Sequence, residues 1–183
     1  MPQFITTKHG ERIGAERLKT GDGPALQAFN ASLSDDVRAR FLPHAYDDET
    51  VARMIARAEA DDDRAYVLRV NDAIVGYFFL WNFMQPVPLL GIGLADEFQG
   101  KSLGPQMMKV LIDDAKDAGR DGIELTTVPE NEAAFKLYRI MGFEHLGEVE
   151  NIAGDGRKVI ERLMFLPLKP GAEPSGHSPK PPE

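Results

Sequence analysis

Apolar residues recur along the chain at two different spacings, which predicts alternating helices and strands. In residues 48–60 and 100–119 the apolar positions repeat every three or four residues, which is typical of one buried helical face. These positions are Val51, Met54, Ile55 and Ala58 in the first segment, and Leu103, Met107, Val110, Leu111 and Ala115 in the second. Between the two segments, β-branched and aromatic residues dominate AYVLRVNDAIVGYFFLWNF on both sides of Asn71-Asp72, which predicts two strands joined by a tight turn.

The remaining segments extend this pattern to one mixed domain. Residues 4–18 predict a hairpin that turns near His9-Gly10, and a helix is expected from about Pro24. Strands are expected at VPLLGIGL and GIELTTV, a helix at NEAAFKLYRIM, and a closing antiparallel pair at GFEHLGEVENI and RKVIERLMFLPL. We therefore expect a single domain over residues 1–168. The following KPGAEPSGHSPKPPE has little to bury, so residues 169–183 are expected to form a disordered tail.

Composition narrows the class of protein. The chain has 183 residues, 43% of them hydrophobic, which suits one domain with a real core. Acidic residues outnumber basic ones by 29 to 21, a formal net charge of -8, which argues against binding to nucleic acid or to an anionic membrane. No apolar run approaches the roughly 18 residues of a membrane span, and MPQFITTKHG does not resemble a secretory signal, so we expect a cytoplasmic protein.

Cysteine and histidine usage excludes further kinds of chemistry. The chain has no cysteine, so disulfides, thiol catalysis and cysteine-ligated metals are ruled out. The histidines show no metal-ligand spacing, and no metal site is expected; they are His9, His44, His145 and His177.

A glycine-containing loop, LADEFQGKSLGPQMM, lies between a predicted strand and a predicted helix. Ala95 and the Gly100-Lys101-Ser102 triplet satisfy a permissive nucleotide P-loop pattern. Against that interpretation, Asp96 and Glu97 would place negative charge where a triphosphate binds, and no later strand ends in an aspartate for magnesium. Small residues at the start of a helix instead favour a diphosphate bound by free backbone N–H groups.

Two motifs carry a family resemblance. QGKSLG followed by a helix and a strand, and then NEAAFKLYRIMGF, resembles the acyl-CoA-binding core of the GNAT superfamily of N-acyltransferases. Gln99 and Gly104 match the ends of the family's loop pattern, which is Arg or Gln, two residues, Gly, one residue, and Gly or Ala. Ser102 stands where the family usually has glycine, and we expect it to adopt a negative φ and to offer its hydroxyl.

The resemblance implies a fold and a cofactor site. The implied fold is of the α+β type, with a mixed, mostly antiparallel central sheet of six to seven strands flanked by about four helices. The implied co-substrate is acetyl-CoA, with no metal. The residues that the resemblance assigns to acetyl-CoA are Leu94, Gln99, Gly100, Lys101, Ser102, Leu103, Gly104, Asn131, Ala134 and Tyr138.

The implied reaction is direct attack of a primary amine on the thioester. Tyr138 is the candidate acid for the leaving thiolate, Glu97 the candidate base, and a backbone N–H near Leu94 the candidate oxyanion donor. A non-catalytic CoA-binding or regulatory module with the same fold is the alternative. On a purely structural interpretation, Gly100 and Gly104 only form a turn and a packing contact, and Tyr138 is a core residue.

The acceptor is expected to be an amine-bearing small molecule, protein or peptide. In the family, the first two helices and their link usually border the acceptor site, and here that region together with Trp81-Asn82-Phe83 would play this role. Five acidic residues in it favour a cationic acceptor, unless they simply cap helices: Asp35, Asp36, Asp47, Asp48 and Glu49. No nucleic-acid or membrane partner is expected, and a homodimer is possible.

Overall fold

The computed structural model describes residues 3–176. The strands are β1 (Gln3–Thr6), β2 (Arg12–Arg17), β3 (Arg64–Val70), β4 (Ala73–Trp81), β5 (Leu89–Leu94), β6 (Gly122–Thr127), β7 (Glu144–Ile152) and β8 (Lys158–Pro167). The helices are α1 (Gly23–Ser32), α2 (Asp35–Arg40), α3 (Asp48–Glu59), α4 (Leu103–Asp117) and α5 (Glu132–Ile140), with a short 3-10 turn, η1 (Asp96–Phe98).

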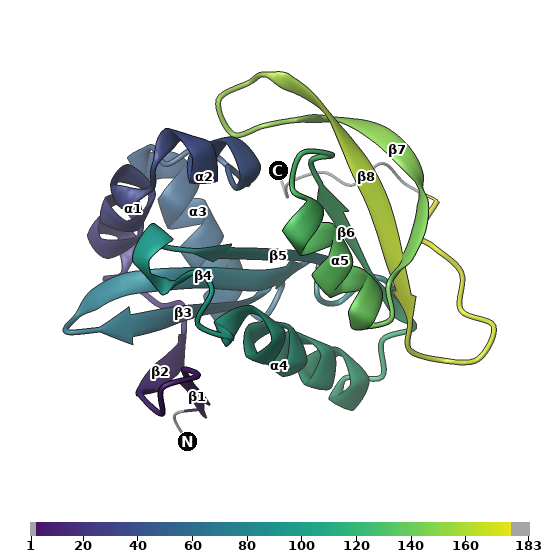
Figure 1. Ribbon diagram of the computed structural model, residues 1–183, viewed down its shortest axis with the longest axis horizontal. Helices are drawn as coiled ribbons and strands as arrows, with labels where there is room; N and C mark the ends of the chain where they lie inside the picture. Colours follow the sequence, from purple (N-terminus) through teal and green to yellow (C-terminus); the bar gives the residue numbers. More distant parts are fainter. Residues whose placement is uncertain (1–2, 177–183) are drawn as a thin grey trace.

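All the strands join one mixed sheet, as expected. Its order is β1-β2-β3-β4-β5-β6-β8-β7, and only the β5–β6 pair is parallel (Figure 1). The described chain has eight strands and five α-helices, one strand and one helix more than the expected upper figures. The additional helix is α2, whose six residues bury only Val37 and so leave no apolar stripe for a periodicity argument to detect.

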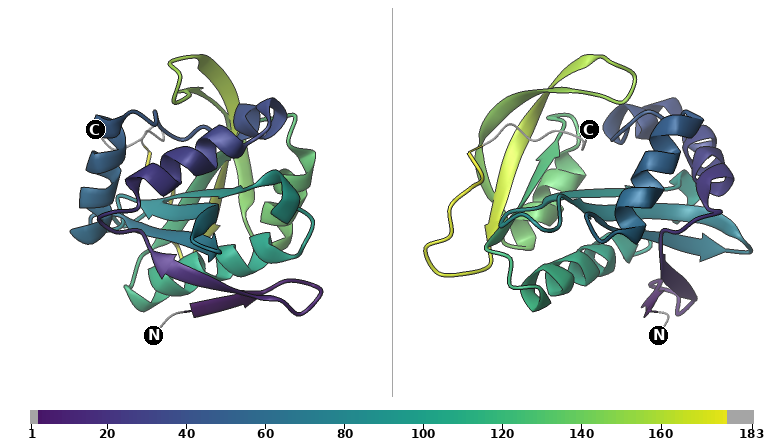
Figure 2. Two further views of the ribbon diagram at one scale, coloured as in Figure 1. Left: turned by 90° about the vertical axis from the view of Figure 1, so that its left-hand side faces the viewer. Right: turned by 180° about the vertical axis from the view of Figure 1, so that it is seen from behind.

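The core lies on both faces of the central strand β4, where eight of its nine residues are buried. Helices α1 and α3 cover one face of the sheet, and α4 lies against the other (Figures 1 and 2). The predicted stripe of α3 is fully buried, whereas Val110 of the α4 stripe is only half-buried. Burial on both faces explains why β4 has an almost continuous apolar sequence instead of an alternating one.

Local chemistry explains where several elements begin and turn. The turn between β3 and β4 is made by Asn71 and Asp72, both at positive φ (47° and 66°), which suits a tight hairpin. Helix α3 begins after Asp47, whose carboxylate accepts a hydrogen bond from the backbone N–H of Thr50 (2.9 Å). The turn was predicted from the residues alone, and capping was one of the two interpretations left open for Asp47.

The segment after β8 returns along the sheet. The Lys169 ammonium donates to Asp121 (2.7 Å), and the backbone N–H of Ser175 donates to the buried carboxylate of Glu124 (2.7 Å). Residues 177–183 of the expected tail lie outside the described residues. Among residues 3–176, none of the helices combines the length and the apolarity needed to cross a bilayer.

Candidate active site

Strands β5 and β6 separate part-way along their length and open a fork in the sheet. Their parallel ladder ends at Leu90↔Leu125. The N–H of Ala95 donates to Val75 of β4, and the carbonyl of Leu94 accepts from the Gln99 side chain (3.3 Å). Because backbone groups alternate in direction along a strand, the N–H groups of residues 92 and 94 point away from β4 and into the fork.

The fork opens into a cavity of about 450 Å³. Helix α4 begins at its edge, where the first-turn N–H groups of a helix have no intrahelical acceptor. Gly100 and Ser102 both have positive φ (70° and 65°) just before α4, and the Gly100 side of the loop is open. The arrangement suits an anionic group at the helix N-terminus.

The expectation for the conformation of Ser102 was wrong. Its φ is 65° and its ψ is 25°, which is the left-handed region, and its side chain makes no capping hydrogen bond to α4. The chain must turn sharply between η1 and α4, and glycine meets such a turn without the steric cost that serine incurs. Serine in place of the family's usual glycine therefore has two effects: it strains the backbone at residue 102, and it adds a hydroxyl to the loop.

Helix α5 forms the opposite wall of this cavity. Asn131 caps the helix, because its side-chain oxygen accepts from the Ala134 N–H (3.3 Å). Tyr138 lies two turns later on the same wall, and no described residue hydrogen-bonds its hydroxyl. The tyrosine is half-buried, and desolvation of its ring raises its pKa to about 12, so the hydroxyl keeps its proton at neutral pH.

The structure brings together nearly all the residues that the sequence assigned to acetyl-CoA. Those lining the larger cavity are Leu94, Gln99, Gly100, Ser102, Leu103, Gly104, Asn131, Ala134 and Tyr138. Lys101 does not line it: its ammonium lies over the Phe98 ring (4.9 Å to the centroid), and its carbonyl accepts from the Lys8 N–H. Only the backbone of Lys101 therefore contributes to the loop's shape.

The carboxylates beside the loop lie elsewhere. Glu97 is exposed on η1 and lines neither this cavity nor the second one described below. Asp96 accepts from the backbone N–H of Ser34 (3.0 Å), and hydrogen bonds from Ser34 lower its pKa. Asp96 thus ties η1 to the start of α2.

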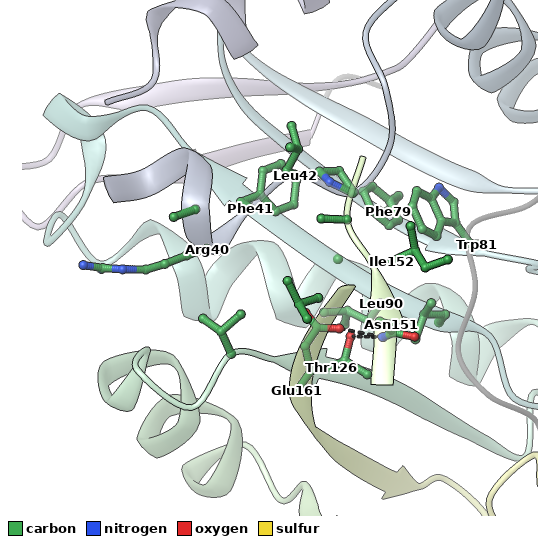
Figure 3. A pocket seen from close by; sticks show the side chains of 17 residues that line it. Arg40, Phe41, Leu42, Phe79, Trp81, Leu90, Thr126, Asn151, Ile152 and Glu161 are labelled. Carbon is green, nitrogen blue, oxygen red and sulfur yellow. Dashed lines mark hydrogen bonds between the residues drawn. The ribbon is translucent and has the colours of Figure 1, made fainter. Parts of the chain in front are cut away.

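A second, smaller cavity of about 110 Å³ continues from the same fork (Figure 3). The two cavities share part of their lining, namely Arg40, Phe41, Leu90, Gly91 and Thr126. The sequence predicted that the α2 region and Trp81 border the acceptor site, and both line this cavity. Nothing in the sequence indicated Asn151 and Glu161, which line it from the closing hairpin. No motif could have found them, since only the pairing of β6, β8 and β7 brings their side chains to the fork.

The five acidic residues of the helical region do not line either cavity at the fork. Asp35 and Asp36 lie in the first turn of α2 and pair with Arg38 and Arg40 of the same helix, while Asp47 caps α3. Ion pairs within α2 and the cap of α3 account for Asp35, Asp36 and Asp47, so these charges give no support to a cationic acceptor at the fork. Within residues 3–176, no group of three or more potential metal-ligating side chains is arranged to hold an ion, and His177 lies outside the described residues.

A model of the acetyltransferase (GNAT) family matches residues 30–143, more than half of the chain. The chain belongs to the GNAT acetyltransferase family. Its match spans α2 to α5 and so includes the loop, the fork and the helix that carries Tyr138. No curated protein matches the chain.

Solved structures share this fold at low sequence identity. Mycobacterium smegmatis RimJ in complex with CoA-disulfide is 15% identical with a TM-score of 0.74, covering 91% of this chain and 87% of that one. A ribosomal-protein-alanine N-acetyltransferase from Brucella melitensis is 20% identical (TM-score 0.68; 84% and 99% covered). A spermidine N-acetyltransferase from Vibrio cholerae in complex with CoA and spermine is 18% identical (TM-score 0.67; 85% and 95% covered).

Membership in the GNAT family decides between the alternatives left open by the sequence. The protein is an N-acetyltransferase, and acetyl-CoA is the co-substrate typical of its family. The P-loop match of Gly100-Lys101-Ser102 is therefore coincidental, because the co-substrate typical of the family is acetyl-CoA and not a nucleoside triphosphate.

Proposed function

We propose that this GNAT protein acetylates a primary amine of a small molecule or protein, with the cofactor bound along the 450 Å³ cavity. The observation that carries the proposal is the fork itself, where free N–H groups of β5 face Tyr138 of α5 across one cavity. The diphosphate of acetyl-CoA is assigned to the start of α4, where helix N–H groups and the helix dipole favour an anion. The pantetheine arm is assigned to the open edge of β5, whose unpaired backbone groups suit its amides.

The chemistry follows from this arrangement. The amine nitrogen attacks the thioester carbon and loses its proton to water, and the N–H of Leu94 is the donor that we assign to the oxyanion. As the C–N bond forms, the C–S bond breaks, and the sulfur takes the hydroxyl proton of Tyr138. Tyr138 regains a proton from solvent. The role requires a protonated acid when sulfur leaves, and a tyrosine hydroxyl meets this requirement at neutral pH even at its ordinary pKa of about 10.

Glu97 has no role in this proposal. It is exposed on η1 and lines neither cavity, so its carboxylate lacks a short path to an amine at the fork. The acceptor class is supported by two neighbours whose names specify amines, spermidine in one and a ribosomal-protein alanine in the other. The homodimer suggested at the start stays a prediction.

The test is removal of one hydroxyl. Tyr138→Phe keeps the ring and its packing against Phe143, so binding of acetyl-CoA should be preserved while kcat falls by roughly 10²- to 10⁴-fold. The assay is release of free CoA with an accepted amine, alongside acetyl-CoA binding by calorimetry. Tyr66→Phe is the matched control, because that hydroxyl only donates to Asp114 (2.6 Å) and its loss should lower stability without changing turnover.

Normal turnover by Tyr138→Phe would make Tyr138 a packing residue and leave protonation of the thiolate to water. A wild-type protein that binds acetyl-CoA but acetylates no amine would overturn the proposed reaction.

A further inference from the structure

The smaller cavity lies beyond the fork, between the end of α2 and the β7–β8 hairpin. Its floor is formed by three polar side chains from three strands, Thr126, Asn151 and Glu161, which point toward one another (Figure 3). The amide nitrogen of Asn151 donates to the Glu161 carboxylate (2.5 Å) and lies 3.5 Å from the Thr126 hydroxyl. Since Thr126 also lines the larger cavity, the carboxylate lies beside the cavity assigned to acetyl-CoA.

Glu161 gives this cavity an uncompensated negative charge. None of the ion pairs formed by residues 3–176 involves it. The other charged lining residue, Arg40, pairs with Asp36 on its own helix and extends away from the cavity (Figure 3). A half-buried carboxylate with one amide donor has unused acceptor capacity, which favours a cation as its partner.

The walls of the cavity are aromatic and aliphatic. Phe79 and Trp81 stack on one another (4.3 Å between centroids), and Phe41 adds a third ring. Aromatic faces attract an ammonium group and also suit the methylene chain behind it. The lining therefore matches a cationic head on an apolar stem.

The cavity is also narrow, because the hairpin tip closes its far side. Gly154 donates its N–H to the carbonyl of Leu42 (2.9 Å), and a Cβ at this glycine would lie 2.3 Å from the carbonyl oxygen of His44. The 110 Å³ that remains equals about three to four water molecules, at roughly 30 Å³ each. This volume accepts a short aliphatic chain.

We propose that Glu161 determines acceptor specificity by binding the ammonium group of a short aliphatic primary amine. The inference rests on the proposed function and names the acceptor class for it. The carboxylate draws the cation into the cavity and holds its nitrogen beside the fork. The ammonium first loses one proton to water and becomes the neutral amine, and this amine loses a second proton to water as the C–N bond forms, as in the transfer described above.

The experiment compares Glu161→Gln with wild type on two probes of similar shape and different charge. Butylamine is protonated at neutral pH, whereas acetohydrazide, which has a similar length, is uncharged. We expect Glu161→Gln to lower kcat/KM for butylamine by roughly 10- to 100-fold, mostly through KM, because the ammonium loses its negatively charged partner. The value for the hydrazide and the KM for acetyl-CoA should not change.

Glu150→Gln is the matched control, since Glu150 lies on the same hairpin, pairs with Lys158 (3.4 Å) and does not line the cavity. It should behave as wild type with every probe. If wild type acetylates butylamine and Glu161→Gln acetylates it equally well, the role of Glu161 is refuted while the proposed function stands. An equal loss with butylamine and with the hydrazide also refutes charge recognition. If wild type acetylates no amine, both the proposed function and this inference are refuted.

Discussion

Replacement of Ser102 by glycine should stabilise the protein, although Ser102 lies in the cofactor loop. Serine at φ 65° costs about 1–2 kcal/mol relative to a right-handed conformation, a cost that glycine avoids. Glycine loses about 0.5–1 kcal/mol more backbone entropy on folding, so the net gain from Ser102→Gly is about 0.5–1 kcal/mol. For a chain of this size, the gain corresponds to a rise in Tm of about 1–4 °C.

Two controls separate the backbone from the hydroxyl. Ser102→Ala keeps the Cβ and should have the same Tm as wild type, because the Ser102 hydroxyl makes no capping hydrogen bond to α4. Ser34→Gly makes the same substitution at another helix N-cap, where φ is -61° and the side chain accepts from the Val37 N–H (3.3 Å). There the exchange should cost a few tenths of a kcal/mol. A lower Tm for Ser102→Gly than for wild type would refute the strain argument.

The same position tests contact with the cofactor. Ser102→Gly should keep or tighten the affinity for CoA, since the backbone can approach the diphosphate at least as closely. Ser102→Glu should abolish binding, because it places negative charge beside the diphosphate at the start of α4. Titration calorimetry with CoA measures both. Unchanged affinity in the glutamate variant would mean that this loop does not touch the cofactor.

Two further predictions concern ligand and pH. Acetyl-CoA at about 100 times its Kd should add roughly 2.7 kcal/mol to the free energy of unfolding and raise Tm by several degrees, whereas ATP with magnesium should leave Tm unchanged. A rise in Tm with ATP-magnesium and none with acetyl-CoA would contradict the cofactor assignment. Burial lowers the pKa of His44 from its usual 6.5, so the folded state favours neutral imidazole and the unfolded state takes up the proton first as pH falls. The His44 contribution to stability is therefore complete above about pH 6.5 and is lost below it. In urea unfolding, the stability difference between wild type and His44→Gln should shrink from about pH 7.5 to about pH 5.5; a constant difference would rule out this linkage.

Most elements were predictable because their signals are local. The stripe of α3 and the Asn71-Asp72 turn each depend on a few adjacent residues, and the structure has them where expected. Helix α2 was missed because a six-residue helix with one buried side chain has no periodicity to read. The conformation of Ser102 was also missed, since its positive φ is imposed by the path of the chain between η1 and α4 rather than by the serine itself.

The sequence by itself determined the class of fold and pointed to the residues that we propose hold the cofactor. Those residues lie in two short segments, 94–104 and 131–138, because α4 and α5 each follow closely after a strand of the fork. Only the tertiary structure brings together the residues that we propose for the acceptor side. Asn151 and Glu161 reach Thr126 because β8 pairs with β6 and β7 lies outside it, and because the hairpin tip packs on the segment after α2. Strand order and register depend on long-range pairing and on burial of one face, and a single-residue shift would turn Glu161 to the opposite face of the sheet.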